Sequence, residues 1–192
     1  QAEDYDHWAQ LGNKGWSFQD VLPYFKKMES YHGGSDELRG RNGPLPVTDS
    51  AKLSPLFDAV IKSSEAIGIK FNADYNGVDQ EGIAMTQATI LKGRRQSTAL
   101  CYLEPAKVRP NLTIITDAIV LSLSFEGKRC KGVRFLKDGQ MIEKLAFREV
   151  ILSSGSINSP QILELSGIGQ HDLLAKNGIT PFHELPGVGE NL

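Results

Sequence analysis

Helical periodicity dominates the first half of the chain and is broken by polar, glycine-rich segments. A serine followed three residues later by an acid, Ser17 and Asp20, forms a capping-box pattern and predicts a helix over about residues 17–30. A second helix is predicted from Ser54-Pro55, with apolar residues three and four positions apart up to Gly68. A third is predicted over residues 97–109.

Between these helices the sequence indicates loops and short extended segments. Residues 32–43 are polar and rich in glycine, which is typical of a mobile loop, and residues 43–47 then favour an extended backbone. Residues 70–82 read as a loop with a turn at Asn76-Gly77. Residues 83–90 alternate loosely between apolar and polar, as a strand does.

The second half carries the clearest strand pattern. Alternating segments at residues 119–125, 131–136 and 141–147 are separated by short turn sequences, and they predict an antiparallel β-meander. Continuous apolar runs at residues 112–115 and 149–153 flank it. The first predicts a buried strand, and the second predicts a strand buried on both faces.

The run at 149–153 leads into a small-residue turn, Ser153-Ser154-Gly155. Ser159-Pro160 then predicts the start of a helix that ends at Gly167, and a shorter helix is predicted over residues 171–177. A strand, a small-residue turn and a helix together expose backbone N–H groups that can hold an anion or a ribose phosphate. The same arrangement more often serves only to reverse the chain, so by itself it leaves both interpretations open.

Composition narrows the classes of function. The chain has 192 residues, of which 40% are hydrophobic and 23% charged, with a net charge of -2. The absence of a basic stripe argues against nucleic acid as a partner, and no apolar run approaches the ~20 residues of a membrane span. Cys101 and Cys130 lack metal-type spacing, so we expect reduced, buried thiols and a cytoplasmic location.

No catalytic or metal-binding residue is predicted from the polar side chains. Glu164 fits a solvated helix face and Ser97 fits a helix cap, while Arg94-Arg95 could meet a phosphate but is more simply a solvated pair. Metal ligands usually recur at short helical spacings, and the histidines do not. The four histidines are His7, His32, His171 and His183.

The run at residues 155–169, GSINSPQILELSGIG, resembles the second signature of the glucose–methanol–choline (GMC) oxidoreductases at every defining position. Within that family the sequence is most similar to choline-dehydrogenase-like members. The missing Met at Gln1 and the loop-like end at residues 187–192 indicate an internal fragment of a longer chain. Further segments resemble the family at residues 4–8, 15–17, 42–45, 93–99, 109–113 and 187–192.

The resemblance implies a mixed α/β fold with two interleaved parts. Residues 1–96 would belong mainly to an antiparallel substrate domain with N-terminal helices. Residues 97–192 would form part of an FAD-binding, Rossmann-like sheet with the meander as a crossover. The resemblance further implies FAD contacts from the backbone of Val120, beside the adenine, and from Ser153, Ser154 and Gly155, beside the adenosine ribose.

The function implied is hydride transfer from a primary alcohol, with choline as the first substrate candidate, to FAD. The Gly-x-Gly-x-x-Gly fingerprint that carries the pyrophosphate is absent from the chain. The family's catalytic histidine pair would lie beyond Leu192, so no catalytic residue is assigned. The alternative is a non-catalytic scaffold that binds no flavin by itself, and a nicotinamide-binding domain fits poorly for want of the fingerprint. Apolar surface left uncovered would favour self-association of the fragment.

Overall fold

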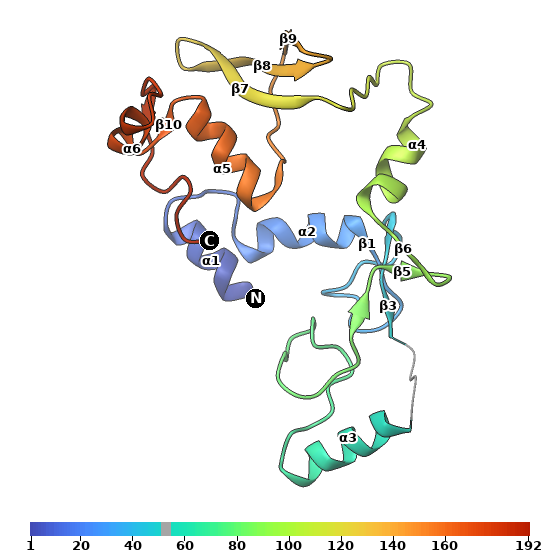
Figure 1. Cartoon of the computed structure of the whole chain (residues 1–192). Coiled ribbons are helices and arrows are strands. Elements are labelled where there is room, and N and C mark those ends of the chain that lie inside the picture. Colours follow the sequence, from blue (N-terminus) through green and yellow to red (C-terminus); the bar gives the residue numbers. More distant parts are fainter. Residues whose placement is uncertain (51–54) are drawn as a thin grey trace. The chain divides into compact units, whose positions relative to one another are not determined.

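A computed structural model describes residues 1–50 and 55–192 (Figure 1). The chain divides into two compact units, residues 1–112 and 113–192. Both contain helices and strands, so the predicted mixed α/β class is confirmed. The assignment of residues 1–96 and 97–192 to a substrate domain and an FAD-binding domain stays a prediction.

Two packed helices open unit 1. α1 (Ala2–Gln10) packs against α2 (Phe18–Met28), and the rings of Tyr5 and Phe25 meet edge to face at 5.8 Å. The predicted cap of α2 is confirmed, because Ser17 Oγ accepts the Asp20 N–H at 3.3 Å and the Asp20 carboxylate accepts the Ser17 N–H at 3.2 Å. These reciprocal bonds satisfy backbone donors that the first helical turn leaves without partners.

The strands in the described part of unit 1 are all two residues long. The extended segment predicted at residues 43–47 is confirmed, while the strand predicted at 83–90 is reduced to short pieces. The pairs are β1 (Glu29–Ser30) parallel to β2 (Leu45–Pro46), β3 (Thr48–Asp49) antiparallel to β4 (Gln87–Ala88), and β5 (Ile90–Leu91) antiparallel to β6 (Arg94–Arg95). Ladders this short contribute few backbone hydrogen bonds, so side chains must hold much of this unit together.

The second predicted helix is α3 (Leu56–Ala66), and Ser54 of its predicted start lies outside the described residues. Gly68 follows the helix with φ of 85°, which confirms it as the C-terminal glycine. The apolar stripe is present but is not covered within the described part of the chain, and Ile67 is 76% exposed. The third predicted helix is confirmed as a π-helical turn, η1 (Ala99–Leu103), that runs into α4 (Glu104–Ala106).

Unit 2 contains the predicted meander. β7 (Ile119–Glu126), β8 (Arg129–Lys137) and β9 (Gln140–Leu145) are antiparallel in the order β7-β8-β9 (Figure 1). The turn between β8 and β9 places Asp138 and Gly139 at φ of 51° and 74°, the conformation that two-residue hairpin turns require.

A helical layer completes unit 2. α5 (Gly155–Leu165) packs against β7, and α6 (His171–Lys176) follows it, ending before Gly178 as predicted. β10 (Ile168–Gly169) pairs in parallel with β11 (His183–Glu184). The buried apolar side chains of the unit are Phe135, Ile162, Leu174 and Val188.

Three predictions for residues 112–167 are wrong. The runs at 112–115 and 149–153 are not strands, because a strand needs a neighbouring backbone to bond with and the described residues offer them none. Ile151 is accordingly 77% exposed. The predicted helix starts at Gly155 rather than at Ser159-Pro160, and Pro160 lies inside α5. Proline prefers the first helical turn, but here the residues before it add a further turn.

Two smaller findings concern cysteines and helix length. Cys101 and Cys130 are both free, and each is half-buried rather than buried. Among the helices in the described part of the chain, none is long and apolar enough to cross a membrane.

Candidate functional site

The turn before α5 presents the residues that the sequence assigns to a flavin. Ser154 is the N-cap of α5, and its own N–H donates to Ser159 Oγ at 2.9 Å. Gly155 has φ of 90°, and a Cβ added there would meet no heavy atom within 4 Å. Ser153, Ser154 and Gly155 are all exposed. The first turn of α5 therefore offers open backbone N–H groups and the positive end of a helix dipole.

Val120 lies on β7, opposite Phe135 of β8, next to an irregularity in the ladder between Val120 and Ser122. β7 is an edge strand of the meander, and an edge strand presents one row of backbone groups that no neighbouring strand pairs with. Within the described residues no hydrogen bond joins Val120 to the turn at Ser153–Gly155. The structure thus places the four predicted residues in one unit, three contiguous and one on a separate strand.

Ser166 connects the two elements that carry these residues. The Leu123 N–H of β7 donates to Ser166 Oγ at 2.8 Å, and that hydroxyl donates to the Ile162 carbonyl of α5 at 2.5 Å. The rings of Phe125 and Phe182 stack nearby at 4.7 Å. The two Ser166 bonds fix the C-terminal end of α5 against β7, while the exposed turn lies at the other end of the helix.

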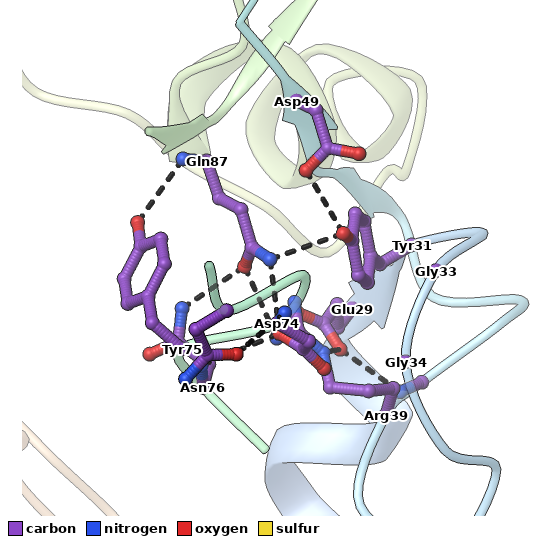
Figure 2. A network of polar contacts seen from close by, with 12 residues as sticks. Glu29, Tyr31, Gly33, Gly34, Arg39, Asp49, Asp74, Tyr75, Asn76 and Gln87 are labelled. Atoms are coloured by element: carbon purple, nitrogen blue, oxygen red, sulfur yellow. Dashed lines mark hydrogen bonds and ion pairs between the residues drawn. The ribbon is translucent and has the colours of Figure 1, made fainter. Parts of the chain in front are cut away.

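Unit 1 holds a buried polar cluster around Arg39, which Figure 2 shows from close by. The guanidinium is 4% exposed and binds the Glu29 carboxylate through two hydrogen bonds, of 2.6 and 3.1 Å. The remaining guanidinium nitrogen, Nη1, donates to Asp74 Oδ1 at 2.8 Å and to Gln87 Oε1 at 3.1 Å. A bidentate Arg–carboxylate pair is among the strongest charge-assisted contacts in proteins. Arg39 is therefore compensated by two carboxylates.

Tyr31 extends the cluster on its other side. Its ring lies 4.2 Å from the Arg39 guanidinium carbon, and its hydroxyl donates to Asp49 Oδ1 at 2.9 Å while accepting from Gln87 Nε2 at 3.0 Å. Burial and the hydrogen bond to Asp49 raise the pKa of Tyr31 to about 12. The cluster therefore links β1, β3 and β4 with the loop that carries Asp74 (Figure 2).

Gly34 is required where the cluster meets the 32–43 loop. It has φ of 69°, and a Cβ there would press on the Asp74 carboxylate and on Arg39 Cγ. Asp74 Oδ2 is buried against this glycine and has no hydrogen-bond partner among the described residues. A side chain at position 34 would thus clash as well as strain the backbone.

The 32–43 loop, predicted to be mobile, is tied down by Arg41. Its guanidinium donates to the carbonyls of Tyr31, Gly33 and Gly34 at 2.7, 2.5 and 2.8 Å. The Tyr31 N–H also donates to the Gly40 carbonyl at 2.9 Å. Glycine content alone indicated mobility, but these bonds hold the loop in one arrangement.

A cavity of about 900 Å³ opens beside the cluster, formed by residues of unit 1 alone. Its walls come from α1, α2, β2, β4 and the loop at residues 75–81, with Glu29 and Arg39 at the side of the cluster. A volume of this size is in the range of small-molecule sites. Among the described residues, the cavity and the turn before α5 are the candidate sites that we consider.

Sequence reasoning missed the Arg39 cluster altogether. Two arginines in a glycine-rich loop, Arg39 and Arg41, were a usable signal, because charged residues in such a loop often find buried partners. Their partners could not be named, since Asp74 and Gln87 lie 35 and 48 residues further along the chain. The histidines give no metal centre: no group of three potential ligands forms among the described residues, and His171 pairs with Glu184 at 3.0 Å.

Relatives with established names resemble the chain over its whole length. Oxygen-dependent choline dehydrogenase of Brucella anthropi is 44% identical over 191 residues, which cover 100% of this chain and 35% of that protein. Mitochondrial choline dehydrogenase of Mus musculus is 44% identical over 191 residues, covering 100% of this chain and 32% of that protein. The chain thus spans about a third of the length of these relatives.

Solved structures give the same result. Pyridoxine 4-oxidase from Mesorbium loti matches with a TM-score of 0.88 and 30% identity, covering 97% of this chain and 37% of that one. An FAD-dependent oxidoreductase from Chaetomium thermophilum matches with a TM-score of 0.90 and 29% identity, covering 100% and 36%. The family model described as GMC oxidoreductase matches residues 1–192. The resemblance seen at residues 155–169 is therefore confirmed, and the chain belongs to the GMC oxidoreductase family.

Proposed function

We propose that this chain is part of an FAD-dependent oxidoreductase that oxidises a primary alcohol, with choline as the first candidate substrate. The observation that carries the proposal is the family signature at residues 155–169, which folds into an exposed helix start with an open glycine. The 44% identity to proteins named choline dehydrogenase supports the substrate.

The residues at the start of α5 fit a dinucleotide. The Ser153 and Ser154 hydroxyls and the free N–H groups of the first turn can donate to ribose and phosphate oxygens, and Gly155 leaves the ligand room to approach the backbone. Val120 would contribute backbone groups of β7 beside the adenine, an assignment that rests on the sequence resemblance. When bound, FAD would supply the acceptor for the substrate hydride. We assign no residue of the chain to the acid–base step.

The test compares the 192-residue chain with the longest polypeptide that its gene encodes. Each is supplied with FAD, freed of unbound cofactor, and examined anaerobically for flavin absorption before and after choline is added. We expect choline to bleach the flavin of the longer polypeptide. A longer polypeptide that retains no flavin would contradict the proposal and favour a scaffold role.

A matched pair of glycine variants tests the site itself. Gly155→Val should lower FAD affinity by at least about tenfold, because the side chain occupies the space through which the ligand approaches. Gly178→Val is the control: Gly178 also has positive φ and open space, but it follows α6. Equal losses in both variants would indicate general strain rather than a flavin contact.

The 192-residue sequence lacks the Gly-x-Gly-x-x-Gly fingerprint that binds the pyrophosphate. This absence favours the second candidate function, a scaffold that binds no flavin by itself. A colourless 192-residue chain beside a yellow longer polypeptide would agree with both statements. A yellow chain would remove the scaffold candidate.

Two further expectations are proposals about the environment of the protein. We propose a cytoplasmic location, although the mouse relative carries the word mitochondrial in its name; cell fractionation against compartment markers tests it.

We also propose self-association of the chain through exposed apolar side chains such as Phe147, which is 98% exposed. A strictly monomeric mass in light scattering at high concentration would contradict this second proposal.

A further inference from the structure

The two edges of the β7-β8-β9 meander differ in how their backbone groups are covered. β8 pairs with both neighbours, so β7 and β9 are the edge strands. Along β7 the register shifts between Val120 and Ser122, α5 packs against the strand, and the Leu123 N–H donates to Ser166 Oγ. Irregular register and covering elements are common means of keeping an edge strand from pairing with another chain. The β7 edge is therefore partly blocked.

The β9 edge lacks such protection in the described part of the chain. β9 pairs with β8 in unbroken register, and the Ala146 N–H donates to the Lys131 carbonyl at 2.7 Å just beyond the strand. In an antiparallel pair, residues that exchange bonds with the neighbour alternate with residues that do not. The backbone groups of Met141, Glu143 and Leu145 therefore face away from β8. Among the described residues, no other strand or loop bonds to them.

The side chains of this edge suit contact with another strand. Met141, Glu143 and Leu145 are spaced two apart, so they lie on one face of the sheet, and the two apolar members are 64% and 63% exposed. Arg134 lies opposite Glu143 on β8, with 3.4 Å between its Nε and the carboxylate oxygen Oε1, and it offsets that charge. An exposed edge strand with apolar side chains is a template for pairing with another chain.

The order Met141-x-Glu143-x-Leu145 also indicates which chain would pair there, because an apolar residue stands at equal spacing on each side of one acid. A twofold axis through Glu143 aligns two copies of β9 antiparallel and sets each Met141 opposite Leu145 of the second copy. We infer that the β9 edge is an interface between two copies of this chain, which pair backbone to backbone into one continuous sheet. The inference rests on the self-association proposed above and names its surface.

This register satisfies the backbone and separates the lysines. Each facing pair of outward residues exchanges two N–H···O bonds, as in any antiparallel ladder. Lys144, on the other face of the sheet, comes to lie opposite Ile142 of the second copy rather than opposite another lysine. The one unfavourable contact is at the axis, where the two Glu143 carboxylates meet, since like charges directly opposite destabilise a strand pair. Arg134 of each copy offsets part of this repulsion.

The first test measures the monomer–dimer equilibrium of the 192-residue chain by sedimentation equilibrium and light scattering. Glu143→Pro should weaken the dimer at least about tenfold, because proline removes an N–H that faces the second copy and not one that bonds to β8. Glu143→Ala is the matched control: it removes the same side chain, keeps the N–H, and should retain the dimer. Glu143→Gln should tighten the dimer about two- to fivefold, because it removes the like charges at the axis.

Hydrogen exchange locates the contact within the strand. At low protein concentration the amides of Met141, Glu143 and Leu145 should exchange fast. At high concentration their exchange should slow at least about tenfold, because they then donate to the second copy. The amides of Ile142 and Lys144, which donate to β8, should be protected at both concentrations.

Circular dichroism melts show whether each variant still folds; if Glu143→Pro does not, the exchange pattern of the wild-type chain and the response to Glu143→Gln decide. A strictly monomeric chain would overturn both the self-association and this interface. A dimer that Glu143→Pro leaves intact, or one that forms without slowing the amides of Glu143 and Leu145, would overturn the interface alone and leave the self-association standing. A dimer that Glu143→Gln weakens would overturn the twofold pairing centred on Glu143.

Discussion

Unit 1 and unit 2 are held together by different kinds of bond. In unit 2, strands of eight, nine and six residues form a continuous backbone ladder between neighbours in the sequence. In unit 1 the strands have two residues each, and the charged side chain of Arg39 joins segments that lie 10, 35 and 48 residues away from it. Local hydrogen bonds organise one unit, and a buried charged cluster organises the other.

This difference predicts which mutations will lower the free energy of unfolding most in each unit. A ladder distributes its free energy over many similar bonds, so single polar side chains matter little and packed apolar residues matter most. A buried charged cluster concentrates it, because removing one member leaves the remaining charges buried without compensation. The experiments below test this contrast, and both tryptophans, Trp8 and Trp16, report on unit 1 only.

The largest effect is expected from Arg39→Met. It leaves the Glu29 and Asp74 carboxylates buried without their cation, and it should lower the free energy of unfolding of unit 1 by about 3–5 kcal/mol. Urea denaturation followed by tryptophan fluorescence measures the loss. Arg95→Met, on an exposed position of β6, should change stability by less than about 0.5 kcal/mol.

A triple variant separates charge from packing. Adding Glu29→Gln and Asp74→Asn to Arg39→Met removes the uncompensated charges, so more than half of the lost stability should return. If the triple variant is as unstable as the single one, the packing of the arginine stem is what matters, and the contrast between the two units weakens.

Phe135→Ala should have the next largest effect, about 3 kcal/mol, because it leaves a cavity beneath β8, where the ring is buried. Hydrogen exchange of the β7 and β8 amides measures the loss within unit 2. Phe147→Ala removes the same side chain from a fully exposed position and should leave those exchange rates unchanged. Faster exchange in both variants would argue against a core centred on Phe135.

Tyr31→Phe should lower the stability of unit 1 by about 1–2 kcal/mol at neutral pH, because the Asp49 and Gln87 contacts lose their common partner. Comparing this variant with the wild-type chain also tests how the stability of unit 1 depends on pH. The pKa of Tyr31 is raised to about 12 in the folded chain from an ordinary value of 10.0, so the folded state retains the proton longer than the unfolded state does.

The stability that this proton contributes is therefore complete below pH 10 and is lost as the pH rises towards 12. The wild-type chain should lose about 2 kcal/mol more than Tyr31→Phe over this interval. Urea titrations of both proteins at several alkaline pH values measure the difference. Parallel curves would mean that Tyr31 ionises as an ordinary tyrosine does.

The smallest effect is expected from Ser166→Ala. The Leu123 N–H loses its acceptor, which should cost unit 2 about 1 kcal/mol and speed the exchange of that amide. Ser156→Ala, at an exposed position of α5, is the control. A loss as large as that of Phe135→Ala would mean that unit 2 also depends on single polar contacts.

The amino-acid sequence predicted the elements that are built from neighbours. The Ser17–Asp20 cap, the meander with its turn at Asp138 and Gly139, and the glycine ends at Gly68 and Gly178 were all confirmed. Each depends on residues a few positions apart, where side-chain period and backbone preference act directly. The signature at residues 155–169 was likewise readable because it is contiguous.

The features that the sequence failed to predict depend on partners far away in the chain, and a local sequence pattern does not identify such partners. The apolar runs at 112–115 and 149–153 have the composition of strands, yet a strand forms only when another backbone accepts its hydrogen bonds. The Arg39 cluster depends on Asp74, which comes from a distant loop, and on Gln87, which comes from β4. The sequence determined the local elements and the family of this protein. Only the tertiary structure decided which charges are buried together, because burial is a property of the packed chain rather than of any one segment of it.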